Sequence, residues 1–302
     1  MVASGLRMIL RADATRAIGA GHAMRLATLG AAWRAAGGEV VAVGDHAIGF
    51  VAAHYRDLGI AVHSEGPGPS DVLVVDSYDP GIRFHHAQPL EGTVRVLLDD
   101  LGGAVPAGFD VVWNPNPYGG PDRYPEFAGY VLSGSDYLAI RPDVPAWIRE
   151  RDEVVVSIGG TAPDGALRDA LVQLAPLVPN ERLAIVGDEG LPGWRTIEPT
   201  RFWSEASGAK ALVTAAGGTV WEAAVSGIPV VVLQIVDNQR FGYRWVRDAG
   251  VPGINALLVD GDFMAHQLRA LIPAARPLPP LENGAHRVVA SLARLARARR
   301  AA

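Results

Sequence analysis

The sequence predicts an α/β protein with two domains, each built on a doubly wound parallel sheet. Short runs rich in β-branched residues alternate with stretches of helical length, which is typical of parallel strands covered by helices. Each half of the chain also carries a strand, a glycine turn and a helix in succession, around residues 19–22 and 215–219. The 302 residues are enough for two domains with separate cores.

The composition narrows the class of protein. Apolar residues make up 49% and charged residues 20% of the chain, as in globular proteins. The net charge of −5 argues against a nucleic-acid partner held through phosphates. The absence of cysteine excludes disulfides and thiolate sites, and the histidines show no metal-ligand spacing, so neither a metal nor a cofactor is expected. No apolar run reaches the length of a membrane span, so we expect a cytoplasmic protein without membrane insertion.

In the first half, polar residues follow the expected strands at their carboxyl ends. Strands are expected at 6–11, 40–43, 60–63, 72–75, 94–98 and 109–113, with helices at 22–36 and 47–58 and a short one before 94. Open α/β sheets bind ligands at the edge where these strands end. The residues placed there are Asp13, Asp76, Tyr78, Asp99 and Asn114. Ordinary turn formation explains each of them equally well.

A change in composition marks the expected domain boundary. Residues 115–150 are rich in Pro, Gly and Tyr, so we divide the chain into 1–145 and 146–302. Further strands are expected at 153–158, 183–186, 211–213 and 229–233. A basic helix at 283–300 ends the chain, and a solvated face or packing onto the first domain is favoured over a membrane or partner helix.

His22 is the candidate general base. It follows Gly19 and Gly21 at the start of a helix, where the positive helix end favours the neutral imidazole. A capping or surface histidine is the alternative. The glycine pattern lacks the third glycine of the dinucleotide fingerprint, and the second expected strand has no clear ribose-binding acid after it. A dinucleotide-dependent oxidoreductase is therefore disfavoured.

The second glycine turn is a candidate diphosphate site. We expect the helix to begin at Thr219, with Gly217 and Gly218 leaving its first amides open to an anion. Glu222 has two interpretations. Thr219 and Glu222 have the spacing of a capping box, which would make the glutamate structural. If its side chain turns outward instead, its carboxylate can accept hydrogen bonds from both ribose hydroxyls. No P-loop motif is present.

Two family resemblances enter through these motifs. TVWEAAVSGIP at 219–229 resembles the MurG glycosyltransferases, in which the glutamate binds ribose and the glycine turn binds diphosphate. A wider set of motifs resembles the PseG-type and SpsG-type sugar-nucleotide hydrolases. These motifs are LRAD at 10–13, IGAGHAMR at 18–25, VVDSY at 74–78, LLDD at 97–100, GSDYLAIRP at 134–142, SIGG at 157–160 and VDNQ at 236–239. PseG enzymes release UDP from UDP-2,4-diacetamido-2,4,6-trideoxy-β-L-altropyranose in pseudaminic acid biosynthesis.

The resemblance implies a GT-B architecture, in which two Rossmann-like domains flank an interdomain cleft. It also implies hydrolysis of a UDP-sugar, an amino or acetamido deoxysugar, to UDP and free sugar. The implied catalytic residues are His22, Tyr78 and Asp13. The implied UDP-binding residues are Gly217, Gly218, Thr219, Glu222, Phe202 and Gly159. The implied sugar-binding residues are Gly21, Arg25, Asn238 and Gln239.

Some features depart from the family and leave alternatives open. Relatives often have serine in the turn where this chain has Ala216 followed by two glycines, and residues 115–124 match no motif, which leaves the sugar undetermined. A GT-B glycosyltransferase and a non-catalytic nucleotide-sugar-binding protein are the alternatives, and the oligomeric state is open.

In the expected mechanism, the amides at the helix start stabilise the charge of the departing UDP. A water held by His22, helped by Tyr78 or Asp13, attacks the anomeric carbon.

Overall fold

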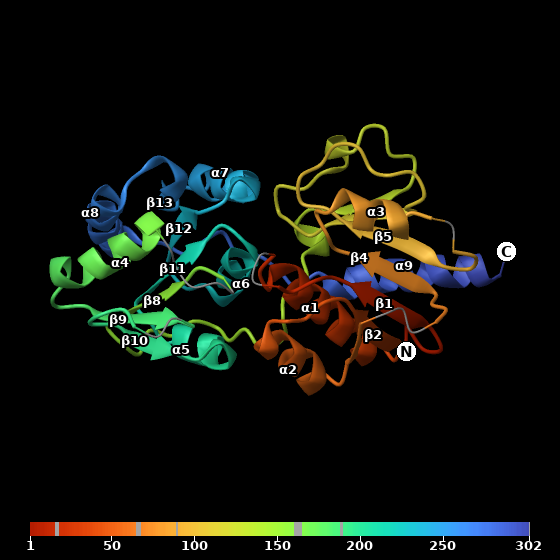
Figure 1. Cartoon of the computed structure of the whole chain (residues 1–302), viewed down its shortest axis with the longest axis horizontal. Helices are drawn as coiled ribbons and strands as arrows, with labels where there is room; N and C mark the ends of the chain where they lie inside the picture. Colours follow the sequence, from red (N-terminus) through yellow and green to blue (C-terminus); the bar gives the residue numbers. More distant parts are fainter. Residues whose placement is uncertain (16–17, 65–67, 89, 160–164, 188–189, 302) are drawn as a thin grey trace. The chain divides into compact units, whose positions relative to one another are not determined.

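The computed structural model describes residues 1–15, 18–64, 68–88, 90–159, 165–187 and 190–301. The chain forms two compact units, shown in Figure 1. The first unit comprises Met1–Arg141 together with Glu282–Ala302, and the second comprises Pro142–Leu281. Each unit contains a parallel sheet covered by helices, so the predicted α/β class with two parallel sheets is confirmed.

The sheet of the first unit has the order β3-β2-β1-β4-β5-β6-β7. Its strands are β1 (Arg7–Arg11), β2 (Glu39–Val43), β3 (Ala61–His63), β4 (Val72–Val75), β5 (Val94–Leu98), β6 (Val111–Asn114) and β7 (Tyr130–Ser133). The chain builds outward in one direction from β1 to β3 and then returns to add β4 on the other side of β1. The strand order therefore reverses between β1 and β4, and open sheets bind ligands at such a switch point.

Alternate residues of these strands enter two cores on opposite faces of the sheet. Met8 and Leu10 of β1 pack in one core, while Ile9 between them packs in the other, as the two-residue period of a strand requires. Helix α1 (Gly21–Ala35) buries Leu26 and Trp33 in the first of these cores. The other helices of the unit are α2 (Gly49–Asp57), α3 (Pro80–His86), α9 (Ala285–Arg300) and the 3₁₀ turns η1 (Pro121–Arg123) and η2 (Ser135–Tyr137).

Helix α9 belongs to the first unit, whereas the division at 145/146 assigned it to the second. Its apolar stripe, which includes Val288 and Leu292, is buried in the same core as α1. Two of its basic residues pair with acids of that unit, since Arg299 donates to both oxygens of Asp110 over 2.8 and 2.9 Å and Arg300 donates to both oxygens of Asp71. Packing onto the first domain is therefore the correct alternative for this helix. The first passage between the units, after residue 141, lies close to the predicted boundary.

Strand β7 was not predicted, because it lies inside the Pro- and Gly-rich segment that was assigned to the crossover. It forms an edge of the first sheet, in register with β6 from Val111 opposite Tyr130 to Asn114 opposite Ser133. Tyr130 is exposed and only Leu132 is fully buried, so the strand lacks the continuous apolar run by which buried parallel strands are recognised.

The sheet of the second unit has the order β10-β9-β8-β11-β12-β13. Its strands are β8 (Glu153–Ser157), β9 (Arg182–Val186), β10 (Arg195–Ile197), β11 (Ala211–Ala215), β12 (Val230–Gln234) and β13 (Gly253–Asn255). Its helices are α4 (Gly165–Leu177), α5 (Phe202–Ala206), α6 (Gly218–Ser226), α7 (Arg240–Asp248), α8 (Gly261–Leu271) and the 3₁₀ turns η3 (Pro199–Arg201), η4 (Asp237–Gln239), η5 (Ala256–Leu258) and η6 (Ile272–Ala274). The strand order reverses between β8 and β11. The two edge strands β10 and β13 have three residues each and were not predicted.

Two further properties concern the described part of the chain. None of its helices is long and apolar enough to cross a membrane. Within the same residues, no group of three or more His, Cys, Asp or Glu side chains has an arrangement that could hold a metal ion.

Candidate functional site

The switch point of the first sheet brings His22 and Asp76 together. His22 is the second residue of α1, which follows β1, and Asp76 comes directly after β4, the neighbour of β1. Nδ1 of His22 lies 2.5 Å from Oδ1 of Asp76. The two residues are 54 positions apart in the sequence, and the pairing of β1 with β4 places them at one edge of the sheet.

Asp76 determines which nitrogen of His22 carries the proton. Burial by itself would raise the pKa of Asp76, but the charges of Arg25 and His22 outweigh burial and hold this pKa well below its ordinary value. An ionised carboxylate can only accept hydrogen bonds, so the proton of the neutral imidazole lies on Nδ1. Nε2 then keeps its lone pair, which is the arrangement that a general base requires.

The structure decides between the alternatives for the position of the His22 side chain. Ala20 is the N-cap of α1, and no side chain caps this helix end. The His22 side chain is 11% exposed, so it is also not a surface histidine. Gly21, the first residue of α1, has open space where a Cβ would stand, so the backbone beside His22 is accessible to a ligand.

Arg25 lies one helical turn after His22 and contacts two buried carboxylates. Its Nε and Nη2 atoms both donate to Asp76, the latter over 2.6 Å. Its Nη1 atom donates to both oxygens of Asp100, over 2.9 and 2.7 Å. The guanidinium of Arg25 is thus engaged by side chains of the protein, which argues against the predicted sugar-binding role of Arg25.

Tyr78 completes the group around His22. Its hydroxyl donates to Oδ2 of Asp100 over 2.6 Å, and its ring lies edge-on to His22 with 4.8 Å between centroids. Burial, together with the charge of Asp100, raises the pKa of Tyr78 far above its ordinary value, so the phenol stays protonated. Because its proton is directed at Asp100, the oxygen of Tyr78 faces other groups as an acceptor. The side chain is 38% exposed and accessible to a ligand.

Residues 115–124, which matched no motif, contribute to the same group. Nδ2 of Asn116 donates to Oδ1 of Asp100 over 2.7 Å. The other strand-end residues have structural roles. Asp99 accepts from the amides of Leu101 and Gly102, and Asn114 donates to the hydroxyl of Tyr124 over 2.9 Å. Turn formation therefore accounts for Asp99 and loop anchoring for Asn114.

Asp13 lies in a different set of contacts from His22. It accepts from both terminal nitrogens of Arg11, over 2.7 and 3.0 Å, and from the amide of Asp45. Burial would raise the pKa of Asp13, but the hydrogen bonds from Arg11 and Asp45 and the charge of Arg11 lower it. Asp13 is thus an ionised partner of Arg11 that fixes the loop after β2.

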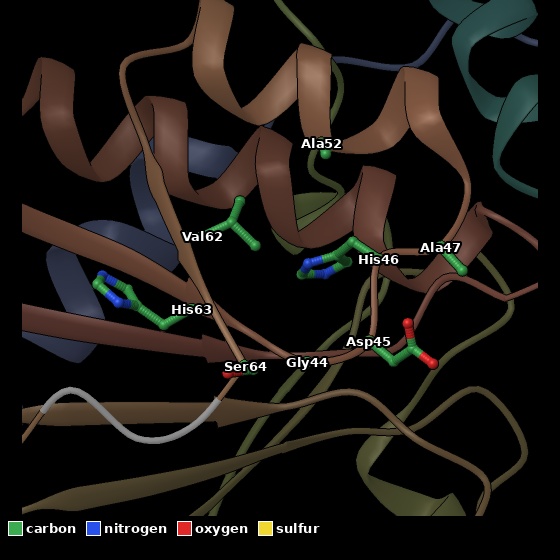
Figure 2. Close-up of a pocket in the computed structure, with 8 residues that line it drawn as sticks. All are labelled: Gly44, Asp45, His46, Ala47, Ala52, Val62, His63 and Ser64. Atoms are coloured by element: carbon green, nitrogen blue, oxygen red, sulfur yellow. The ribbon is translucent and has the colours of Figure 1, made fainter.

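A shallow pocket of about 440 Å³ opens beside this loop, at the carboxyl ends of β2 and β3 (Figure 2). It is lined by Gly44, Asp45, His46, Ala47, Ala52, Val62, His63 and Ser64. The lining includes none of the residues predicted to bind or to catalyse. This pocket is therefore separate from the His22 group.

In the second unit, two glycine turns lie at the switch point between β8 and β11. Gly217 and Gly218 follow β11, and Gly159 follows the neighbouring strand β8. A Cβ at Gly159 or Gly218 would meet nothing within 4 Å, so both turns present accessible backbone. Gly160 and Thr161, which follow Gly159 in the sequence, lie outside the described residues.

Helix α6 begins at Gly218, one residue before the predicted start. Its N-cap is Gly217, and no side chain caps it. The amides of Ala216 and Gly217 are used within the fold, by Leu233 and Ala215. The next amides, those of Gly218 and Thr219, belong to the first helical turn, whose N–H groups have no acceptor within the helix. They are the donors that an anion would meet here.

The capping-box interpretation of Glu222 is wrong. Because the helix starts at Gly218, Thr219 lies inside it and cannot be its cap. The carboxylate of Glu222 accepts instead from the indole nitrogen of Trp203 over 2.9 Å. Phe202, expected near uracil, is 6% exposed and packs beside Trp203.

Asn238 and Gln239 lie in η4, which follows β12. Oε1 of Gln239 accepts from the amide of Ile235 over 3.0 Å. Its Nε2 atom lies 4.0 Å from the point where a Cβ of Gly217 would stand. Gln239 therefore lies beside the glycine turn at Gly217.

The residues that the sequence interpretation missed are Asp100, Asn116 and Trp203. Asp76 was recognised only as a strand-end residue. Its position after a buried strand was visible in the sequence, and so was that of Asp100. Their partners were not visible, because the order of the strands decides which strand ends are neighbours.

Solved structures with this fold match nearly the whole chain. A crystal structure described as the glycotransferase of kitacinnamycin matches with a TM-score of 0.61 and 16% identity over 97% of this chain and 95% of that one. MurG from Acinetobacter baumannii matches with a TM-score of 0.59 and 13% identity over 96% and 99%. A putative UDP-N-acetylglucosamine 2-epimerase from Listeria monocytogenes matches with a TM-score of 0.63 and 12% identity over 95% of each chain.

These similarities establish the fold class. The chain has the GT-B type of fold found in these glycosyltransferases, as the sequence predicted. No family model and no curated protein sequence matches the chain. The resemblance to PseG-type hydrolases therefore stays a prediction.

Proposed function

We propose that this protein is a nucleotide-sugar hydrolase that cleaves the anomeric C–O bond of a UDP-sugar and releases UDP and free sugar. The observation that carries the proposal is the His22–Asp76 pair at the switch point of the first sheet. A buried carboxylate that accepts a hydrogen bond from Nδ1–H leaves Nε2 of the imidazole as a proton acceptor. This arrangement suits the activation of an oxygen nucleophile.

In the proposed reaction, Nε2 of His22 removes a proton from water as the water oxygen bonds to the anomeric carbon. The bond from that carbon to the β-phosphate oxygen breaks, and its electron pair leaves with UDP. The amides of Gly218 and Thr219 stabilise the charge on the leaving diphosphate, so no acid is needed to protonate it. The acceptor oxygen of Tyr78 helps to orient the water or a substrate hydroxyl. The pairing of Asp13 with Arg11 favours Tyr78 over Asp13 for this role.

We assign the nucleotide to the glycine turns and their neighbours. Glu222 binds the ribose hydroxyls, Phe202 lies near the uracil, and Gly159 allows close approach of the diphosphate. Asn238 and Gln239 contact the sugar, together with the backbone at Gly21. The position of Gln239 beside Gly217 supports this assignment.

A glycosyltransferase is the second candidate, and the structural neighbours favour it. Two of the matched structures are described as a glycotransferase and as MurG. In that reaction a hydroxyl of an acceptor molecule replaces water, and His22 would deprotonate it in the same way. A non-catalytic binding protein would have no need of the buried His22–Asp76 pair.

The deciding experiment measures nucleotide release from a panel of UDP-, CDP- and dTDP-sugars by the purified protein without an acceptor. Rapid release of UDP, lowered by about 10²- to 10⁴-fold in His22→Ala and His22→Asn, supports the hydrolase. Release that starts only when acceptor alcohols are added supports the transferase. Binding of UDP without turnover under both conditions, or release that is unchanged in the His22 variants, contradicts the proposed role of His22.

A further inference from the structure

Five side chains of the first unit form a closed ring of contacts. His22 is hydrogen-bonded to Asp76, and Arg25 donates hydrogen bonds to both Asp76 and Asp100. Asp100 also accepts a hydrogen bond from the hydroxyl of Tyr78. The ring of Tyr78 returns to His22, edge-on at 4.8 Å. Every member comes from the carboxyl edge around β1, β4 and β5 or from the first turns of α1.

Arg25 contributes all three of its nitrogens to this ring. Nε and Nη2 hold Asp76, and Nη1 holds both oxygens of Asp100. Nη2 also lies 3.2 Å from Nδ1 of His22. Such a planar fork fixes the direction of a carboxylate, which a lysine could not do. With Nε on one oxygen of Asp76 and Nη2 on the other, the side of Oδ1 that faces Nδ1 of His22 is determined.

We propose that Arg25 is a positioning residue that sets the tautomer of His22, and not a ligand of the sugar. It does so by keeping Asp76 ionised and directed at Nδ1, with Asp100 as the second anchor of the guanidinium. The catalytic meaning of this inference rests on the proposed function of His22. Its structural part does not, because the tautomer can be measured without a substrate.

The reason lies in the two carboxylates. Asp76 and Asp100 are both buried, and the charge of Asp76 acts to raise the pKa of Asp100. Without the cation between them, burial and like charge favour protonation of one carboxylate, and we expect this to be Asp76, because Asp100 keeps the hydrogen bonds from Tyr78 and Asn116. A protonated Asp76 would donate to Nδ1 of His22, and the imidazole proton would move to Nε2. Nε2 could then no longer accept a proton from the nucleophile.

Histidine side-chain ¹⁵N–¹H correlation spectra test this directly. They are recorded at roughly pH 8.5, about two units above the ordinary imidazole pKa, so that imidazoles are largely neutral. His22→Asn assigns the His22 signals. The wild-type protein is expected to show His22 protonated on Nδ1, whereas Arg25→Met is expected to show it protonated on Nε2.

A double variant separates the charge effect from general disruption. Arg25→Met with Asp100→Asn removes the cation and one of the two carboxylates, so Asp76 can ionise again and the Nδ1–H form should return. Arg299→Met is the matched control, since it breaks another two-bond pair with an aspartate, at the opposite edge of the same sheet, and should leave the His22 signals unchanged. If Arg25→Met does not fold, Arg25→Gln carries the same expectation.

A His22 that keeps its Nδ1–H form without Arg25 overturns the inference, as does a double variant whose spectrum stays like that of Arg25→Met. Kinetics supply a second readout. A positioning residue predicts that Arg25→Met lowers kcat by about 10²-fold or more with KM changed less than about threefold, whereas a sugar ligand predicts a raised KM. If the wild-type protein releases no nucleotide, the proposed function fails while the spectra still decide the role of Arg25.

Discussion

The indole nitrogen of Trp203 donates a hydrogen bond to Oε2 of Glu222, at a distance of 2.9 Å. Trp203 lies in α5 and Glu222 in α6, so the bond joins two helices of the second unit. The bond fixes one oxygen of the carboxylate that we propose to bind the ribose.

We predict that Trp203→Phe weakens UDP binding about tenfold while leaving the fold intact. A hydrogen bond to a charged group contributes about 1.5–3 kcal/mol, and part of this would remain because Glu222 stays in place. Calorimetric titration with UDP measures the effect. Trp194→Phe is the matched control, since its indole donates to the carbonyl of Leu171 in the same unit. Equal affinities for UDP in both variants would contradict the assignment of Glu222 to the nucleotide site.

Gly218→Ala separates binding from stability. An added Cβ meets nothing within 4 Å, so the free energy of unfolding should change by less than about 1 kcal/mol. The methyl group would stand where a diphosphate approaches the amides, so UDP affinity should fall about tenfold or more. Gly49→Ala is the control, because Gly49 is also the first residue of a helix with open space around it. Unchanged UDP affinity in Gly218→Ala would place the diphosphate elsewhere.

Asp76→Asn should lower the rate of nucleotide release by about 10²-fold or more with little change in KM. The asparagine amide can donate to Nδ1, which favours the wrong tautomer of His22. Asp110→Asn, which disturbs an Arg–Asp pair at the other edge of the sheet, should have a nearly normal rate. Nucleotide release at the wild-type rate by Asp76→Asn would contradict the role of the pair.

His86 should make the first unit less stable as the pH falls below neutrality. Burial, reinforced by the charge of His85, lowers its pKa to about 4. The unfolded chain therefore takes up this proton first, at about pH 6.5. The contribution of the neutral His86 to the free energy of unfolding is fully present above that pH and is lost as the pH falls towards about 4. The loss should be about 1 kcal/mol, because the partly exposed ring is screened by solvent.

Urea unfolding at about pH 7.5 and about pH 5 measures this difference, above the range in which the aspartates titrate. His86→Gln should reduce the difference, whereas His286→Gln, at an exposed position of α9, should not. A pH dependence identical in all three proteins would show that His86 is not responsible.

Leu292→Ala should destabilise the first unit although Leu292 lies near the end of the chain. Its side chain is fully buried in the core shared with α1, and such truncations cost about 2–5 kcal/mol. Hydrogen exchange should increase in peptides of β1 and α1 and remain unchanged in β8 and β11. Leu268→Ala, buried in α8, should give the reverse pattern. Faster exchange confined to the second unit in Leu292→Ala would contradict the packing of α9.

Local patterns were enough for most strands and for the two glycine turns. The buried run at β4 and the glycines before His22 and at 217–218 are visible in the sequence because they express short-range rules of period and backbone freedom. The edge strands β7, β10 and β13 escaped prediction, because short or half-exposed strands lack a continuous apolar run.

The candidate site was predictable only residue by residue. His22, Tyr78 and Arg25 were selected from one motif each, but their mutual contacts were not, and Asp100 and Asn116 were not selected at all. Glu222 shows the limit most clearly. Its spacing from Thr219 satisfied a capping rule, while a one-residue shift of the helix start made that rule inapplicable and Trp203 became its partner.

The sequence by itself determined the α/β class, the two glycine turns and the position of His22 at a helix start. The tertiary structure decided that Asp76 and Asp100 share Arg25, that His22 faces Asp76, and that α9 returns to the first sheet. The physical reason is that residues far apart in the chain meet according to the order of the strands and the burial of apolar faces. Both are properties of the whole fold, which no short stretch of sequence encodes.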